Sequence, residues 1–146
     1  MTSTALTDLS AGATNVNWLV GDFVDKNAGV DQAVAVSSDG LLIAMSSSLE
    51  RDRAERFAAI ASGLMSLSRG AAQTFQNTGV NQVLVEMFEH LLFVSAISDG
   101  SSLGVLTNKS VDIGSVGYEM TMLVRRVGEH LTPEVISELK SSLHHG

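Results

Sequence analysis

Apolar and polar positions follow two different periods along the chain, and the changes of period mark the expected strands and helices. Residues 80–107, VNQVLVEMFEHLLFVSAISDGSSLGVLT, hold three apolar strand-like stretches with almost nothing between them. The segment 33–45 has the same build, and each segment contains an Asp-Gly pair, a strong short signal for a β-hairpin. We therefore predict strands over 30–36, 41–45, 80–88, 91–98 and 103–108.

The segments between these strands carry apolar residues at helical spacing. A first helix is expected from Asn15 to a stop at Gly29, after a tail over residues 1–14. The longest helix is expected over 52–76, with Asp52 as its cap and Glu55 three residues later, in the manner of a capping box.

Two more helices are expected after the last strand. Ser110 or Asp112 can cap the first of them, and Ile113 opens its apolar stripe. Thr132 and Pro133 suit the cap and the first position of a short final helix. The predicted class is therefore α+β, in the order α-β-β-α-β-β-β-α plus the short C-terminal helix. Residues 143–146 are expected to form a C-terminal tail.

The fourth strand, 91–98, is apolar on both of its faces. Such a strand needs helices or other cover on both sides of the sheet. The turn before it, at Glu89-His90, contains no glycine. The two sets of alternating residues are Leu91, Phe93 and Ile97 on one face and Leu92, Val94 and Ala96 on the other.

The long helix carries two apolar stripes, although one sheet covers only one of them. We favour a contact with a second subunit for the other stripe, because glycine permits close approach of backbones and costs about 1 kcal/mol within a helix. Packing under a loop or the N-terminal tail is the alternative. The first stripe is Ala54, Phe57, Ala58, Ala61, Leu64, Met65, Ser68, Ala72 and Phe75, and the second is Ile60, Gly63, Leu67, Gly70, Ala71 and Thr74.

Composition limits the possible functions. The 146 residues are 45% hydrophobic and only 17% charged, which indicates one domain with a real core. So few charges indicate either a surface covered by another chain or a surface rich in small polar residues. A net charge of −7, with only 9 Lys and Arg, argues against nucleic acid and anionic lipid as direct ligands.

No catalytic or metal-binding motif is recognisable, and neither a cofactor nor an enzymatic activity is expected. The chain lacks cysteine, and its four histidines form no spaced ligand set. Its serines lie in no GxSxG elbow, and its glycines match no nucleotide-binding loop. There is no signal-peptide pattern and no apolar run long enough for a membrane span.

Arg51, Arg53 and Arg56 stand at the start of the long helix. The interaction of a cation with the helix dipole is unfavourable there and costs about 0.3–1 kcal/mol for each residue. Local pairing with Glu50, Asp52 and Glu55 in a solvated segment would explain them, and the alternative is a polar rim around a partner surface.

The chain resembles the bacterial branch of the Roadblock/dynein light chain family, in particular small actinobacterial members found beside Ras-like GTPases. The resemblance covers nearly all of residues 15–131, although Glu89-His90 stands where the family would have glycine. It implies a Roadblock-like domain over 15–142. The matching segments are VAVSSDGLLIAMS at 34–46, RAERFAAIASGLMSLSRGAA at 53–72, VLVEMFEHLLFVSAISDGSSLGVLT at 83–107 and GSVGYEMTMLVRRVG at 114–128.

The resemblance implies a profilin-like, roadblock architecture, with a five-stranded antiparallel sheet between helices. It also implies a homodimer in which the long helices pair and the third-strand edges join. Bacterial members bind Ras-like GTPases, and some activate GTP hydrolysis by reshaping the GTPase's own loops without supplying a catalytic residue. The implied location is the cytoplasm, or the inner membrane face through partners.

The leading hypothesis is therefore a non-catalytic, homodimeric regulator or scaffold for a small Ras-like GTPase. Its rivals are a structural subunit of a sensor-kinase complex without effect on hydrolysis and a small-molecule-sensing domain. The expected interface residues for the second copy or the partner are Arg53, Arg56, Ile60, Gly63, Leu67, Gly70, Ala71, Thr74, Gln82, Leu84 and Glu86.

Overall fold

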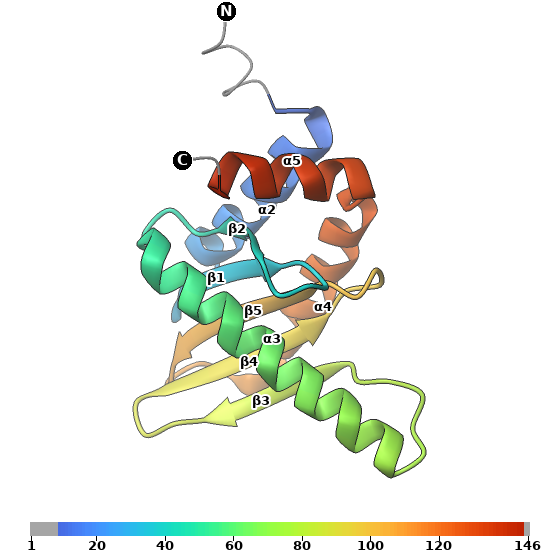
Figure 1. Cartoon of the computed structure of the whole chain (residues 1–146). Helices are drawn as coiled ribbons and strands as arrows, with labels where there is room; N and C mark the ends of the chain where they lie inside the picture. Colours follow the sequence, from blue (N-terminus) through green and yellow to red (C-terminus); the bar gives the residue numbers. More distant parts are fainter. Residues whose placement is uncertain (1–8, 145–146) are drawn as a thin grey trace, which may run out of the picture.

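The computed structural model, which describes residues 9–144, is a five-stranded antiparallel sheet with helices on both faces (Figure 1). The strands lie in the order β2-β1-β5-β4-β3. One long helix, α3, crosses the front of the sheet in Figure 1, and α2 and α4 lie behind it. The predicted class and order are confirmed. The elements are α2 (Ala11–Lys26), β1 (Val30–Val36), β2 (Leu42–Met45), α3 (Arg51–Thr74), β3 (Gln82–Glu86), β4 (His90–Ala96), β5 (Ser102–Asn108), α4 (Ile113–His130) and α5 (Pro133–His144).

The sheet separates two apolar cores, and β4 contributes to both of them. Leu91, Phe93 and Ile97 belong to the core under α2 and α4, together with Met120 and Leu123. Leu92 and Val94 belong to the core under α3, and Ala96 packs against it. The sequence prediction that this strand needs cover on both faces is correct.

Two predicted helix starts are wrong. Helix α2 begins at Ala11 instead of Asn15, because the Ser10 side chain accepts a hydrogen bond from the Ala13 amide at 3.2 Å and caps it. The N-cap of α3 is Glu50, which makes no side-chain cap bond, so Asp52 does not cap this helix. Glu55 faces His144 of α5 at 3.4 Å and is not part of a capping box.

The third strand and its turn also differ from the prediction. Strand β3 covers Gln82–Glu86 only, and the Met87 amide donates to the His90 carbonyl at 2.9 Å. The turn therefore lies at Phe88-Glu89, one residue earlier than expected, because His90 already pairs with Asn108 of β5. Neither Phe88 nor Glu89 adopts a positive φ in this turn, whereas Gly40 and Gly100 adopt φ values of 84° and 93° in the other hairpins.

The last two helices lie side by side with the first one. Asp112, not Ser110, caps α4 by accepting from the Ser115 amide, and Ile113 is 48% exposed instead of buried. Thr132 caps α5 as predicted. His144, which received no role from the sequence, contacts the Leu42 carbonyl of β2 at 3.2 Å.

The division into tails and a domain over 15–142 stays a prediction, and residues 1–8 and 145–146 lie outside the described part.

Candidate interaction surface

One side of α3 remains uncovered by the rest of the chain. Leu67 is 76% exposed and Ile60 is 53% exposed. Both belong to the second predicted stripe, whose six members (Ile60, Gly63, Leu67, Gly70, Ala71 and Thr74) are all exposed. Steps of three and four residues along this stripe are the spacing by which two helices pack together. We call these six residues the α3 stripe.

Gly63 and Gly70 in the α3 stripe have no function within one copy of the chain. A Cβ atom at either position would meet nothing within 4 Å. Each glycine nevertheless costs about 1 kcal/mol relative to alanine in a helix. The fold of a single copy therefore gives no reason for these two glycines.

The edge of β3 lies beside α3 and has no neighbouring strand. Strand β3 is the last strand of the sheet, so its outer backbone groups face away from β4. Gln82, Leu84 and Glu86, the three predicted interface residues of this strand, are exposed. The other edge strand, β2, is different because α5 packs against it and His144 contacts its Leu42 carbonyl.

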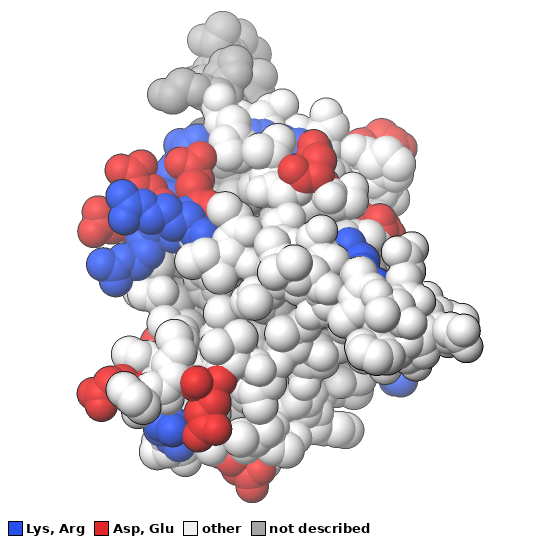
Figure 2. All heavy atoms as spheres, turned by 60° about the horizontal axis from the view of Figure 1, so that its bottom comes forward, with Lys and Arg blue, Asp and Glu red and all other residues white. Residues whose placement is uncertain are grey.

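The α3 stripe and the β3 edge lie in a region almost without charge. Arg69 is the sole charged residue between Arg56 and Glu86. Its guanidinium donates to the Gly100 carbonyl at 3.4 Å and so points back to its own molecule. Figure 2, which brings the bottom of Figure 1 forward, shows a broad area free of charged side chains across the middle of the view. An uncharged surface with exposed leucine and isoleucine is typical of a protein contact.

Arg53 and Arg56 lie at the start of α3, next to the α3 stripe, and are exposed. No ion pair within residues 9–144 joins either of them to Glu50, Asp52 or Glu55. The predicted local pairing of these arginines is therefore wrong, since Glu55 is paired with His144 instead.

Three exposed apolar residues escaped the sequence prediction. Phe75, expected in the core, is 76% exposed, while Phe88 is 98% and Met87 39% exposed. The helical period of α3 predicted the correct side of the helix but not that its last turns extend past the sheet (Figure 1). Between these last turns and β3 lies a hollow of about 390 Å³ lined by Ala72, Phe75 and Val83 among others.

Glu86 at the end of β3 already has a partner in its own chain. Lys109 donates to its carboxylate at 2.8 Å, and this hydrogen bond and charge lower the pKa of Glu86 below its ordinary value of 4.5. Both side chains of this pair are exposed, so neither charge is buried. The pair lies where the uncharged region ends.

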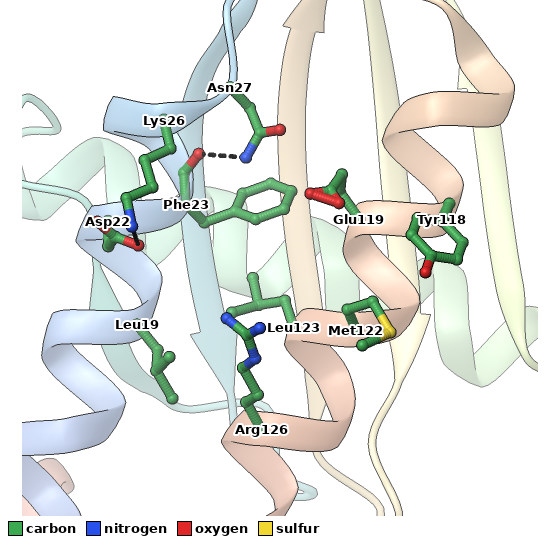
Figure 3. Close-up of a pocket in the computed structure, with 10 residues that line it drawn as sticks. All are labelled: Leu19, Asp22, Phe23, Lys26, Asn27, Tyr118, Glu119, Met122, Leu123 and Arg126. Carbon is green, nitrogen blue, oxygen red and sulfur yellow. Dashed lines mark hydrogen bonds and ion pairs between the residues drawn. The ribbon is translucent and has the colours of Figure 1, made fainter.

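A second hollow, of about 490 Å³, lies between α2 and α4 on the other face of the sheet (Figure 3). Phe23 and Leu123 project between the two helices, and Asp22 pairs with Lys26 at 3.3 Å along its edge. Within residues 9–144, no three His, Asp or Glu side chains gather in a way that could hold a metal ion.

Comparison with known families matches residues 16–107 to the Roadblock/LC7 domain. The chain belongs to this family. A solved Roadblock/LC7 domain from Streptomyces avermitilis is 40% identical, with a TM-score of 0.74 over 78% of this chain and 95% of that one. Comparison with functionally curated proteins gave no match.

More distant solved structures share the fold. MglB from Myxococcus xanthus has a TM-score of 0.74 at 15% identity, over 82% of this chain and 90% of that one. Profilin IA from Acanthamoeba castellanii has a TM-score of 0.54 at 15% identity, over 79% and 98%. The sheet between helices is therefore the profilin-like architecture of the Roadblock/LC7 family. No helix in the described part of the chain is long and apolar enough to cross a membrane.

Proposed function

We propose that two copies of this Roadblock/LC7 domain form a homodimer in which the α3 stripes pair and the β3 edges join. One observation carries the proposal: the exposed, uncharged α3 stripe is continuous with an unpaired strand edge. Joining the edges satisfies the outer backbone groups of β3. Burying an exposed leucine such as Leu67 contributes about 1.5–3 kcal/mol.

The assembly ends at two copies because each chain offers one open edge. Strand β2 is short, and α5 lies against it with His144 on the Leu42 carbonyl. A two-fold contact between identical β3 edges uses up both edges and leaves none for a third copy.

The dimer is a non-catalytic regulator or scaffold for a small Ras-like GTPase, in the cytoplasm or at the inner membrane face through its partners. Support comes from the family membership and from the neighbouring MglB folds, together with the exposed Arg53 and Arg56. These arginines form a cationic border beside the uncharged α3 stripe and suit acidic groups on a partner. The dimer would act by binding one state of the GTPase better than the other.

The test is to mix the purified protein with a Ras-like GTPase from the same organism and to measure complex formation, hydrolysis and nucleotide exchange. The double variant Arg53→Glu with Arg56→Glu should weaken the complex at least tenfold and leave the dimer mass unchanged. Arg126→Glu, on α4 behind the sheet, is the matched control and should bind normally. The absence of any complex, or equal binding by both variants, would refute the proposal.

Two other functions remain open to test. A complex that forms equally with both nucleotide states and leaves hydrolysis unchanged would favour the structural subunit of a sensor-kinase assembly. The hollow between α2 and α4 favours small-molecule sensing as a second candidate, because its size lies within the range of ligand pockets. Thermal stabilisation by one compound of a metabolite panel, abolished by Leu123→Trp in the hollow, would support that function.

A further inference from the structure

The C-terminal end of α3 extends past the edge of its own sheet (Figure 1). Ala72 and Phe75 belong to the first stripe of α3, whose earlier members Ala58, Ala61 and Met65 are buried against the sheet. Phe75 is nevertheless 76% exposed, because the sheet of one copy ends at β3. None of the residues that line the hollow of about 390 Å³ between this end of α3 and β3 is charged. One copy therefore leaves an uncharged hollow beside α3 without a strand to close it.

Hydrogen bonds at the two ends of β3 show which of its residues face the free edge. The Met87 amide donates to the His90 carbonyl at 2.9 Å, and the Ala96 amide donates to the Asn81 carbonyl at 2.9 Å. The bonding side alternates along an antiparallel strand, so the odd-numbered residues of β3 bond to β4 and the even-numbered ones face outward. The residues whose backbone groups point to the free edge are Gln82, Leu84 and Glu86.

The homodimer proposed above, on which this inference rests, joins two such edges. A two-fold axis beside Leu84 pairs all three outward-facing residues within the strand. Leu84 of one copy then lies opposite Leu84 of the other, and Gln82 lies opposite Glu86, a pairing of an amide donor with a carboxylate. An axis beside Glu86 would instead set two carboxylates opposite each other, which is unfavourable. The register centred on Leu84 also sets Met87 of the second copy opposite Asn81.

Met87 lies on the α3 side of the sheet. It continues the alternation of Val83 and Val85, which pack toward α3, and it is 39% exposed. When Met87 of the second copy lies opposite Asn81, its diagonal neighbour on the same face is Val83. Val83 lines the hollow together with Phe75. The second copy therefore brings an apolar side chain to the place where the first copy lacks cover.

The hollow is continuous with the proposed dimer contact. Ala71 belongs both to the α3 stripe and to the lining of the hollow. The residue that arrives there is suited to it, because methionine is flexible and its sulfur makes favourable contacts with aromatic rings such as that of Phe75. A second copy of this chain is thus the occupant that the position, the apolar lining and the strand register favour together.

We propose that Met87 of each copy fills the hollow of the other copy and packs against Phe75. The sheet of the second copy then covers the end of α3 that its own sheet leaves bare, and the dimer contains two such contacts, one at each end of the joined strands. The contacts also fix the register. A shift of the axis from Leu84 to Val85 would move Met87 by two residues along the partner strand, away from Phe75.

Disulfide trapping tests the register, because the chain contains no cysteine. Asn81 and Met87 of one copy are separated by six residues of extended chain, about 20 Å, so cysteines at these two positions form a disulfide only between copies. Between copies they form a pair without backbone hydrogen bonds, with Cα atoms about 4.5 Å apart, within the range of a disulfide. The double variant Asn81→Cys with Met87→Cys should become a covalent dimer on mild oxidation. Each single variant is a control and should not.

Alanine variants test the contact between Met87 and Phe75. Met87→Ala and Phe75→Ala should each raise the dissociation constant of the dimer at least tenfold. The double variant should raise it by much less than the product of the two single effects, because both substitutions remove the same contact. Leu41→Ala is the matched control and should leave the dissociation constant unchanged. Leu41 is exposed to a similar extent, 43%, and directly precedes β2 at the opposite edge of the sheet.

The mass of the wild type in solution separates this inference from the proposed dimer. If the wild type is a dimer but the double cysteine variant forms no covalent dimer, the proposed contact is overturned and the dimer stands. The same conclusion follows if the effects of Met87→Ala and Phe75→Ala multiply, or if Met87→Ala dissociates no more readily than Leu41→Ala. If the wild type is a single copy at micromolar concentration, both proposals fail.

Discussion

At the scale of single residues, Gly63 and Gly70 bear most directly on the proposed pairing of two α3 helices. Both are exposed on α3 with open space around them, so neither tight packing nor a special backbone angle requires glycine there. Their loss would harm only a partner that approaches the helix backbone closely.

The double variant Gly63→Ala with Gly70→Ala should therefore separate chain stability from association. The intrinsic helix propensity of α3 should rise by about 1 kcal/mol for each substitution, while the dimer should dissociate at a higher protein concentration than the wild type. Gly21→Ala in α2, which also faces open space, is the control and should leave dissociation unchanged. Analytical ultracentrifugation of a dilution series measures the dissociation constant of each dimer. An unchanged dissociation constant for the double variant would exclude close helix pairing.

Asp39 links the first hairpin to α5. The Ser37 hydroxyl and then Lys140, 3.0 Å from its carboxylate, lower the pKa of Asp39 below its ordinary value of 3.8. A carboxylate with a lowered pKa stabilises the fold above its unfolded-state pKa, and this stabilisation is lost as the pH falls through the folded-state pKa.

Asp39→Asn should lower the free energy of unfolding by up to about 1 kcal/mol at pH 7, because the pair with Lys140 is largely exposed. The difference from the wild type should shrink as the pH falls below 3.8, since the wild-type carboxyl then becomes neutral as well. Urea unfolding at pH 7 and at pH 3 measures both values. Asp25→Asn, outside every ion pair of residues 9–144, is the control. A difference that does not change with pH would rule out the charge of Asp39 as its cause.

At the scale of elements, patterns with a clear period were predictable and their ends were not. The alternation in β4 correctly predicted two apolar cores, and the second stripe of α3 correctly predicted six residues that one copy leaves exposed. The start of α2 was missed because Ala11, Gly12 and Ala13 have no apolar pattern, although Ser10 before them is a good cap. The exposure of Phe75 was missed because no periodicity states where the sheet under a helix ends.

The cap of α2 gives a direct check at this scale. Ser10→Ala removes the oxygen that accepts from the Ala13 amide and keeps the bond that the Ser10 amide donates to the Glu138 carboxylate of α5. The free energy of unfolding should fall by about 0.5–2 kcal/mol. Thr14→Ala, four residues later on the exposed side of the same helix, should change it much less. If urea unfolding shows that both substitutions lower the free energy of unfolding equally, Ser10 does not cap the helix.

At the scale of the whole molecule, the charged residues are arranged around an uncharged region that one copy does not cover. Charge is nearly absent from the C-terminal half of α3 through β3, and α5 covers the opposite sheet edge. The uncovered apolar side of α3 is therefore predictable from the sequence as one stripe. The sequence does not predict that this exposed surface continues over the β3 edge, Phe75 and Phe88. These residues lie far apart along the chain and come together only in the fold.

The solution mass tests the central proposal most directly. Light scattering of the wild type at micromolar concentration should give twice the chain mass of 15.4 kDa. Leu67→Glu, in the middle of the α3 stripe, should give a single folded copy, because a charge there cannot enter an apolar contact. Thr14→Glu, on the exposed side of α2 and on the other face of the sheet, should remain a dimer. A wild-type protein of single mass, or a Leu67→Glu variant of double mass, would contradict the account.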